Sequence, residues 1–144
     1  MRPAPTSVRD LALRCAERRA RAFHADRCVV VHGDAASANA LRVLTQRAGA
    51  EWGYVFVDPD GFIGDPAYDV GVGLRDWCAE LLADHHPRGT LESWCRLGAD
   101  VTGRDAGEVW DWAFVERVST GLYCLELGAA QVGQPFLDVA TLLA

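Results

Sequence analysis

The sequence predicts an α+β domain that is mostly helical and carries one small β-hairpin in its first half. Apolar residues recur at helical spacing near the N-terminus and over most of the chain after residue 68. Between these stretches lie short runs rich in valine and aromatic residues, bounded by glycine-bearing turns, which is typical of short strands. Half of the 144 residues are apolar and five are tryptophans, so we expect a single domain over residues 1–144 with a substantial core.

In the N-terminal half, a helix is expected over residues 8–24, where Ser7 can cap the first turn. The apolar run 28–31 then reads as a short strand. Two further short strands, 41–44 and 52–57, are separated by a polar, glycine-bearing turn. These two strands form the predicted hairpin.

The rest of the chain is expected to be helical. An amphipathic pattern extends over residues 68–82, after a Gly-Asp-Pro turn. Further apolar patterns predict helices over residues 91–101 and 108–127, and a final short helix over 135–143. No repeat or low-complexity tract interrupts this order.

Charge and cysteine content restrict the classes of function. The net charge of −6 argues against a general nucleic-acid binder, because neutralising phosphates requires a basic surface. The five cysteines have no zinc-ligand spacing and are expected to be reduced. Charged residues interrupt the N-terminal stretch, and no apolar run reaches the length of a membrane span. We therefore expect a cytoplasmic protein that binds neither membrane nor nucleic acid.

One motif carries chemistry. A strand-like run ends in His32-Gly33-Asp34, five residues before Asn39, and the second strand of the hairpin ends at Asp58. Phosphoryl transfer needs a carboxylate to orient the attacking hydroxyl and oxygen ligands to hold Mg²⁺ on the phosphates. Asp34, Asn39 and Asp58 can supply these three groups. Strands paired side by side lie about 5 Å apart, so Asn39 and Asp58 at one end of the hairpin can share an ion.

At these residues the chain resembles the aminoglycoside phosphotransferase family. That family commonly reads H-G-D-x-x-x-x-N, as residues 32–39 do, although alanines stand at positions 35, 36 and 38. The stretches 57–61 and 64–70 resemble most closely the streptomycin and hydroxyurea phosphotransferase group. The resemblance covers residues 28–73 and implies the C-terminal lobe of a protein-kinase-like fold, in which the β-hairpin carries the catalytic loop. It also implies ATP as the phosphoryl donor and Mg²⁺ as cofactor.

The residues of the motif have distinct expected roles. Asp34 is the expected catalytic residue, which holds the acceptor hydroxyl and takes its proton. Asn39 and Asp58 are the expected metal ligands. Structural support of the loop is expected from His32, Asp65 and Asp69, with Asp69 accepting hydrogen bonds from loop amides and Asp65 capping a helix.

The residues that could recognise the acceptor form no motif of this kind. Asp111, Glu116 and Glu126 on the long helix could meet ammonium or guanidinium groups of a small-molecule acceptor. The alternative is that these carboxylates form only the solvated face of an amphipathic helix.

Part of a kinase's nucleotide-binding apparatus is not found in the sequence. All 14 basic residues are arginine, and the 31 residues before His32 contain no Gly-rich loop and no lysine-bearing strand. The chain is therefore read as the C-terminal lobe without its nucleotide-binding partner. The surface near residues 28–31 and the hairpin should then be exposed, which would invite dimerisation or another partner.

Two functions remain open. The leading hypothesis is an ATP-dependent O-phosphotransferase that acts on a small hydroxylated molecule, such as a streptomycin-like aminoglycoside or hydroxyurea, and confers antibiotic resistance. The alternative is a noncatalytic remnant or pseudokinase-like binding module, which the absence of lysine favours.

Overall fold

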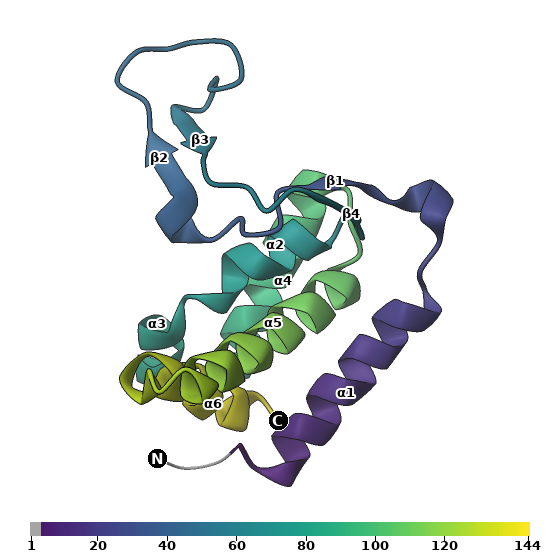
Figure 1. Ribbon diagram of the computed structural model, residues 1–144, viewed down its shortest axis with the longest axis vertical. Coiled ribbons are helices and arrows are strands. Elements are labelled where there is room, and N and C mark those ends of the chain that lie inside the picture. The colour runs from purple at the N-terminus through teal and green to yellow at the C-terminus, as the bar shows by residue number, and fades with distance from the viewer. Residues whose placement is uncertain (1–3) are drawn as a thin grey trace.

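The computed structural model describes residues 4–144, which form a mostly helical α+β arrangement (Figure 1). The N-terminal part contains α1 (Thr6–Arg21), the 3₁₀ turns η1 (Ala25–Arg27) and η2 (Ser37–Asn39), and the strands β1 (Val29–Val31), β2 (Ala40–Arg42), β3 (Tyr54–Phe56) and β4 (Phe62–Gly64). The helices α2 (Tyr68–Arg75), α3 (Cys78–Ala83), α4 (Pro87–Thr102), α5 (Ala106–Glu126) and α6 (Ala130–Leu143) follow.

The strands form two antiparallel pairs. β2 pairs with β3, which confirms the predicted hairpin, and the paired segments are shorter than predicted at both strands. β1 pairs with β4, with Val30 opposite Ile63. The sequence does not predict β4, because three residues beside a glycine turn carry no strand pattern of their own. Figure 1 shows the β2–β3 hairpin projecting away from the helices, whereas β1 and β4 lie against them.

The predicted helix over residues 68–82 is wrong as a single element, because the chain breaks between α2 and α3. Trp77 leaves helical geometry with ψ 48°. Its indole Nε1–H donates to the Gly73 carbonyl at 3.0 Å, which takes the acceptor that the Trp77 backbone N–H would use in a continuous helix. The Cys78 amide instead bonds the Asp76 carbonyl at 2.8 Å.

The other predicted helices are confirmed with shifted ends. α1 ends at Arg21 rather than at residue 24, and α4 begins with Pro87, a residue suited to the first helical position. α4 ends before Gly103, whose φ of 69° is the left-handed conformation that glycine adopts at helix ends. α6 begins at Ala130, five residues earlier than predicted, and has Pro135 inside it.

The core is built around α5, which packs against α1, α2, α4 and α6 (Figure 1). Phe114 of α5 is fully buried together with Val8, Leu91 and Leu137 from three of the surrounding helices. α2 approaches α5 so closely that a Cβ on Gly71 would lie 2.5 Å from Trp112 Cβ. α2 is therefore seated firmly on the core, and it lies directly beneath the loop that follows β1.

None of the helices in residues 4–144 combines the length and the apolar character that crossing a bilayer requires.

Candidate functional site

The Asp34 carboxylate lies at the centre of a small polar group. Its Oδ2 accepts from Asn39 Nδ2 at 2.8 Å, and the same Nδ2 donates to the Asp34 backbone carbonyl at 2.9 Å. Its Oδ1 lies 2.5 Å from Arg75 Nη2. The Asp34 side chain is 37% exposed, so its carboxylate is held in place and is still reachable from solvent.

Asp69, in the first turn of α2, fixes the backbone of this loop. Its two carboxylate oxygens accept from the His32 amide at 2.7 Å and from the Gly33 amide at 2.9 Å. The sequence predicts that Asp69 accepts hydrogen bonds from amides of this loop. Gly33 has φ 89°, and a Cβ there would lie 2.8 Å from Asp60 Cβ and Phe62 Cε1. The loop conformation therefore requires both the glycine and the carboxylate.

The His32 ring connects the loop to the end of β3. Its Nδ1 accepts from the Asp34 amide at 3.3 Å, and its Nε2 lies 3.1 Å from the Val57 carbonyl oxygen. An acceptor at Nδ1 and a donor at Nε2 together require a neutral ring with its hydrogen on Nε2. His32 therefore fixes the Asp34 backbone relative to the residue that precedes Asp58.

Asp58 follows directly after this anchored position. The Val57 amide donates to the Asn39 carbonyl at 3.0 Å, so the backbones of Asn39 and Val57 lie side by side. Asp58 has φ 58°, a left-handed conformation that aspartate tolerates better than most residues. Its side chain is exposed and makes no hydrogen bond or ion pair with any residue of 4–144. The two predicted metal ligands thus flank one end of the hairpin.

The donor chemistry at this end suits Mg²⁺ that is carried by phosphates. Asn39 uses its amide N–H group on Asp34, which leaves Oδ1 as an oxygen ligand, and Asp58 offers a carboxylate. Mg²⁺ is commonly held by one or two carboxylates together with phosphate oxygens and water. Residues 4–144 contain no cluster of three or more His, Cys, Asp or Glu side chains arranged around an ion. Asn39 Oδ1 and the Asp58 carboxylate are the two oxygen groups that this end of the hairpin offers.

Arg75 belongs to the site, and the sequence did not single it out. Besides Asp34, its guanidinium contacts Asp76 Oδ1 at 3.2 Å and Glu116 Oε2 at 3.7 Å, and its side chain is only 15% exposed. Burial of the guanidinium opposes its charge, but the hydrogen bonds and charges of Asp34 and Asp76 outweigh burial and raise the pKa of Arg75. No local pattern in the sequence points to this contact, which joins residues 41 positions apart.

Glu116 completes the charged cluster from the side of α5. Burial raises the pKa of this carboxyl, and the Asp34 charge adds to the effect, whereas Arg75 and a hydrogen bond from Tyr68 lower it. Burial and the Glu116 charge in turn raise the pKa of the Tyr68 hydroxyl. Of the three carboxylates expected to meet the acceptor, Glu116 is the one linked to Asp34, through Arg75.

Asp111 and Glu126, the other two carboxylates expected to meet the acceptor, lie elsewhere on α5. Asp111 is buried against α1, where its carboxylate pairs with Arg18 at 2.5 Å and with Arg19 at 3.2 Å. Glu126 is exposed at the C-terminal end of α5, about 15 Å along the helix from Glu116 at 1.5 Å per residue. The structure brings neither of them to the Asp34 group.

Asp65 stabilises the turn that precedes α2. Its Oδ1 accepts from the Ala67 amide at 2.9 Å, immediately before the helix, and its Oδ2 accepts from Trp112 Nε1 at 3.0 Å. Asp65 therefore joins the turn before α2 to α5. The expectation that Asp65 caps a helix is wrong, because the N-cap residue of α2 is Ala67 and no side chain caps it. It does not touch the Asp34 group.

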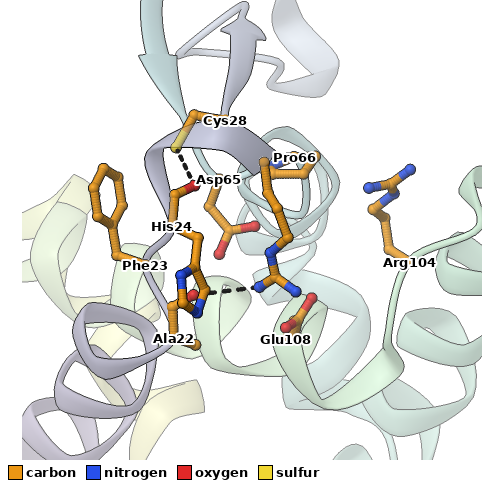
Figure 2. Close-up of a pocket in the computed structure, with 9 residues that line it drawn as sticks. Ala22, Phe23, His24, Cys28, Asp65, Pro66, Arg104 and Glu108 are labelled. Atoms are coloured by element: carbon orange, nitrogen blue, oxygen red, sulfur yellow. Dashed lines mark hydrogen bonds between the residues drawn. The ribbon is translucent and has the colours of Figure 1, made fainter.

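A small hollow adjoins Asp65 between the end of α1 and the start of α5 (Figure 2). Figure 2 shows the Asp65 and Glu108 carboxylates in it, with Arg104 lying apart from them. Both carboxylates pair with Arg19, Glu108 at 2.9 Å and Asp65 at 3.7 Å. The volume of about 100 Å³ is below the roughly 300 Å³ at which ligand pockets begin, so this hollow does not offer a nucleotide or acceptor site.

No known protein family, curated protein or solved structure matches this chain. Any relation to the phosphotransferases therefore depends on the residues of the 32–39 loop and their neighbours.

Proposed function

We propose that this chain provides the catalytic half of an ATP-dependent O-phosphotransferase that acts on the hydroxyl of a small molecule. The proposal is supported chiefly by the position of Asp34, whose partly exposed carboxylate is held between Asn39 and Arg75 on a loop that Asp69 fixes. A streptomycin-like aminoglycoside or hydroxyurea is the acceptor suggested by the resemblance of residues 28–73, and the biological consequence would be antibiotic resistance.

Asp34 would accept a hydrogen bond from the acceptor hydroxyl and orient its oxygen toward the phosphorus. As the P–O bond to the acceptor forms and the bond to the leaving diphosphate breaks, the hydroxyl proton passes to the Asp34 carboxylate. The Arg75 guanidinium keeps this carboxylate charged and oriented before transfer. Little covalent chemistry is required of the protein, so positioning accounts for most of the catalysis.

Asn39 Oδ1 and the Asp58 carboxylate would hold Mg²⁺ at the end of the hairpin. When bound, the metal neutralises charge on the phosphate oxygens of ATP. The His32 ring keeps Asp58 at a constant position relative to Asp34, because it bonds the Val57 carbonyl and the Asp34 amide at once.

Calorimetry of Mg²⁺–ATP binding tests the proposal. Asp58→Asn removes the charge while keeping a residue that tolerates positive φ, and we expect it to weaken binding by about tenfold or more. Asp60→Asn, an exposed carboxylate of the same turn, is the matched control and should bind as the unchanged protein does. Undetectable binding by the unchanged protein at millimolar ATP, or equal binding by all three proteins, would overturn the proposal.

A noncatalytic binding module is the second candidate, and the strand surfaces favour it. Val30 of β1 is 77% exposed and Ile63 of β4 is 66% exposed, and Trp52, in the turn before β3, is 93% exposed. Each two-stranded sheet also leaves strand edges unpaired. Sedimentation velocity discriminates the two functions: a module that works through these strands should self-associate without nucleotide, and Val30→Glu should return it to monomer. A monomer at all concentrations would leave this candidate unsupported.

A further inference from the structure

Arg117 of α5 is a fully buried cation, with 0% of its surface exposed. Within residues 4–144 its hydrogen bonds go to two uncharged groups, the Leu74 carbonyl oxygen at 2.7 Å and Cys78 Sγ at 3.3 Å. Its Nε has no hydrogen-bond partner in this part of the chain. Burying a charge in this way is unfavourable, so the contacts that Arg117 makes are the place to look for its role.

The Leu74 carbonyl belongs to the last turn of α2, where backbone acceptors lose their helical donors. In a continuous helix this carbonyl would accept from the Cys78 amide, but that amide bonds the Asp76 carbonyl instead. Arg117 supplies the missing donor. It also places a positive charge at the C-terminal end of α2, where the helix dipole favours a cation.

Two other side chains hold the same break in the chain. Trp77 Nε1 donates to the Gly73 carbonyl at 3.0 Å, and Cys78 Sγ lies 3.7 Å from the Arg75 carbonyl oxygen. The carbonyls of the last three residues of α2 therefore all accept from side chains. Of the three donors, Arg117 is the one that is both charged and fully buried.

The end of α2 determines where the Arg75 side chain begins. Arg75 is the last residue of this helix and follows Leu74 directly, and its guanidinium reaches Asp34. On α5, Glu116 precedes Arg117 and lies 3.7 Å from the Arg75 guanidinium. Two adjacent residues of α5 thus hold the backbone of α2 just before Arg75 and the guanidinium of Arg75 itself.

Arg117 also affects the charge balance at this end of α2. Asp34, Asp76 and Glu116 bring three negative charges to the single guanidinium of Arg75. Burial lowers the pKa of Arg117, whereas the charge of Asp76 favours its charged form. Arg117 therefore contributes a second positive charge on the Asp76 side of this group, which offsets part of the repulsion among the carboxylates.

We propose that Arg117 is a positioning residue for phosphotransfer, which fixes the end of α2 so that Arg75 meets Asp34 and keeps that carboxylate oriented toward the acceptor hydroxyl. This assignment rests on the proposed function. Arg117 is enclosed by the core and acts only through Arg75. Its loss should free the Arg75 guanidinium, whereas the metal-binding end of the hairpin, which the His32 ring holds, should stay in place.

Phenylglyoxal, which modifies accessible guanidinium groups, tests the assignment without nucleotide. Arg19 is the internal reference, because its side chain is 11% exposed and paired with carboxylates of α5, and the Arg75 side chain is similarly 15% exposed. In Arg117→Met we expect modification of Arg75 to accelerate about tenfold or more relative to Arg19, as measured by peptide mapping. Arg117→Lys keeps the charge without the fork that contacts both Leu74 and Cys78, and should raise the ratio about threefold.

Val118→Ala is the matched control, because Val118 is the next residue of α5 and is 4% exposed in the core. It should destabilise the protein through a cavity and leave the ratio of Arg75 to Arg19 modification unchanged. A constant ratio in the Arg117 variants, or an equal rise in Val118→Ala, would overturn the assignment. Arg117→Lys retains a buried cation, so it decides the question even if Arg117→Met does not fold.

Calorimetry of Mg²⁺–ATP binding separates this assignment from the proposed function. Arg117→Lys should bind Mg²⁺–ATP within about threefold of the unchanged protein, because its site is remote from the hairpin. A weakening as large as that in Asp58→Asn would show that Arg117 supports the whole loop, and would overturn the assignment. If the nucleotide binds and the modification ratio does not respond, the assignment fails and the phosphotransferase proposal stands. If the ratio responds and the unchanged protein binds no Mg²⁺–ATP, Arg117 positions Arg75 and the phosphotransferase proposal fails.

Discussion

Arg75 Nη2 lies 2.5 Å from Asp34 Oδ1, which joins the last residue of α2 to the loop after β1. The same guanidinium contacts Asp76 and Glu116, so one largely buried cation is shared by three carboxylates. In a chain without lysine, this arginine is the basic group that the structure places at the proposed catalytic carboxylate.

Replacing Arg75 should therefore lower both stability and the order of the loop. Arg75→Met leaves the partly buried Asp34 and Glu116 without their shared cation, and we expect a loss of about 3 kcal/mol in the free energy of unfolding. Arg75→Lys keeps the charge but not the forked geometry, and should lose less. Urea unfolding measures both. Arg21→Met is the control, because Arg21 is exposed and, within residues 4–144, pairs with Glu17 on the surface; a similar loss in the control would contradict the assignment.

Asp69 should hold the loop through its two amide contacts. Asp69→Asn replaces one acceptor oxygen with an N–H₂ group that faces a backbone N–H, so we expect a loss of about 2 kcal/mol. Hydrogen exchange at the His32 and Gly33 amides should accelerate by a larger factor than at the buried amides of α5. Unchanged exchange at these two amides would show that the carboxylate does not fix the loop.

Much of this fold is visible in the sequence because its elements are local. The spacing of apolar residues predicts the hairpin and the long helices. Asp34 and Asn39 belong to a short motif, and Asp58 follows the second strand of the hairpin. The features that the sequence does not disclose depend on distant partners. β4 exists because it pairs with β1, more than 30 residues earlier, and α2 ends where the Trp77 indole takes the Gly73 carbonyl.

The same distinction applies to the candidate site. The contact between Arg75 and Asp34 spans 41 residues of sequence, and no local pattern encodes it. Asp111 and Glu116 look alike in the sequence, as acidic residues on one helix. The direction in which each faces separates them: Asp111 meets two arginines of α1, whereas Glu116 meets Arg75 of α2.

Close packing of α2 on α5 should make Gly71 intolerant of a side chain. In Gly71→Ala the new Cβ would lie 2.5 Å from Trp112 Cβ and 2.8 Å from the Ala113 amide nitrogen, and we expect a loss of about 2 kcal/mol. Gly89→Ala is the matched control within α4, where a Cβ meets nothing within 4 Å. It should raise stability by about 0.5 kcal/mol. Thermal unfolding of both variants measures the pair, and a destabilised Gly89→Ala would contradict this account.

Glu116 should make stability depend on pH in a defined direction. Burial raises the pKa of this carboxyl in the folded protein, so the folded state holds its proton more tightly than the unfolded state does. Its contribution is therefore most favourable below the ordinary pKa of glutamate and is lost as pH rises through the folded-state pKa.

The comparison with Glu116→Gln isolates this effect, because most other titrating groups are common to both proteins. We expect the unchanged protein to lose stability relative to Glu116→Gln as pH rises from about 4 to about 8. Urea unfolding across this range measures the difference between the two proteins. A difference that stays constant, or that changes in the opposite direction, would show that burial does not dominate the pKa of Glu116.

The five cysteines should divide into two reactivity classes. Burial raises the pKa of Cys15 to about 11 and that of Cys95 to about 12, and it also raises the pKa of Cys78. Cys28 and Cys124 are partly exposed. Because the thiolate is the reacting form, iodoacetamide at about pH 8 should alkylate Cys28 and Cys124 faster than the three buried thiols by about a hundredfold or more.

Peptide mapping by mass spectrometry gives the rate at each cysteine. In guanidinium chloride, where burial is removed, the five rates should converge, which controls for differences in local sequence. Alkylation of Cys15 or Cys95 in the folded protein at the rate of Cys28 would mean that α1 and α4 open readily from α5. That result would contradict the packing in which both thiols are fully enclosed by the core.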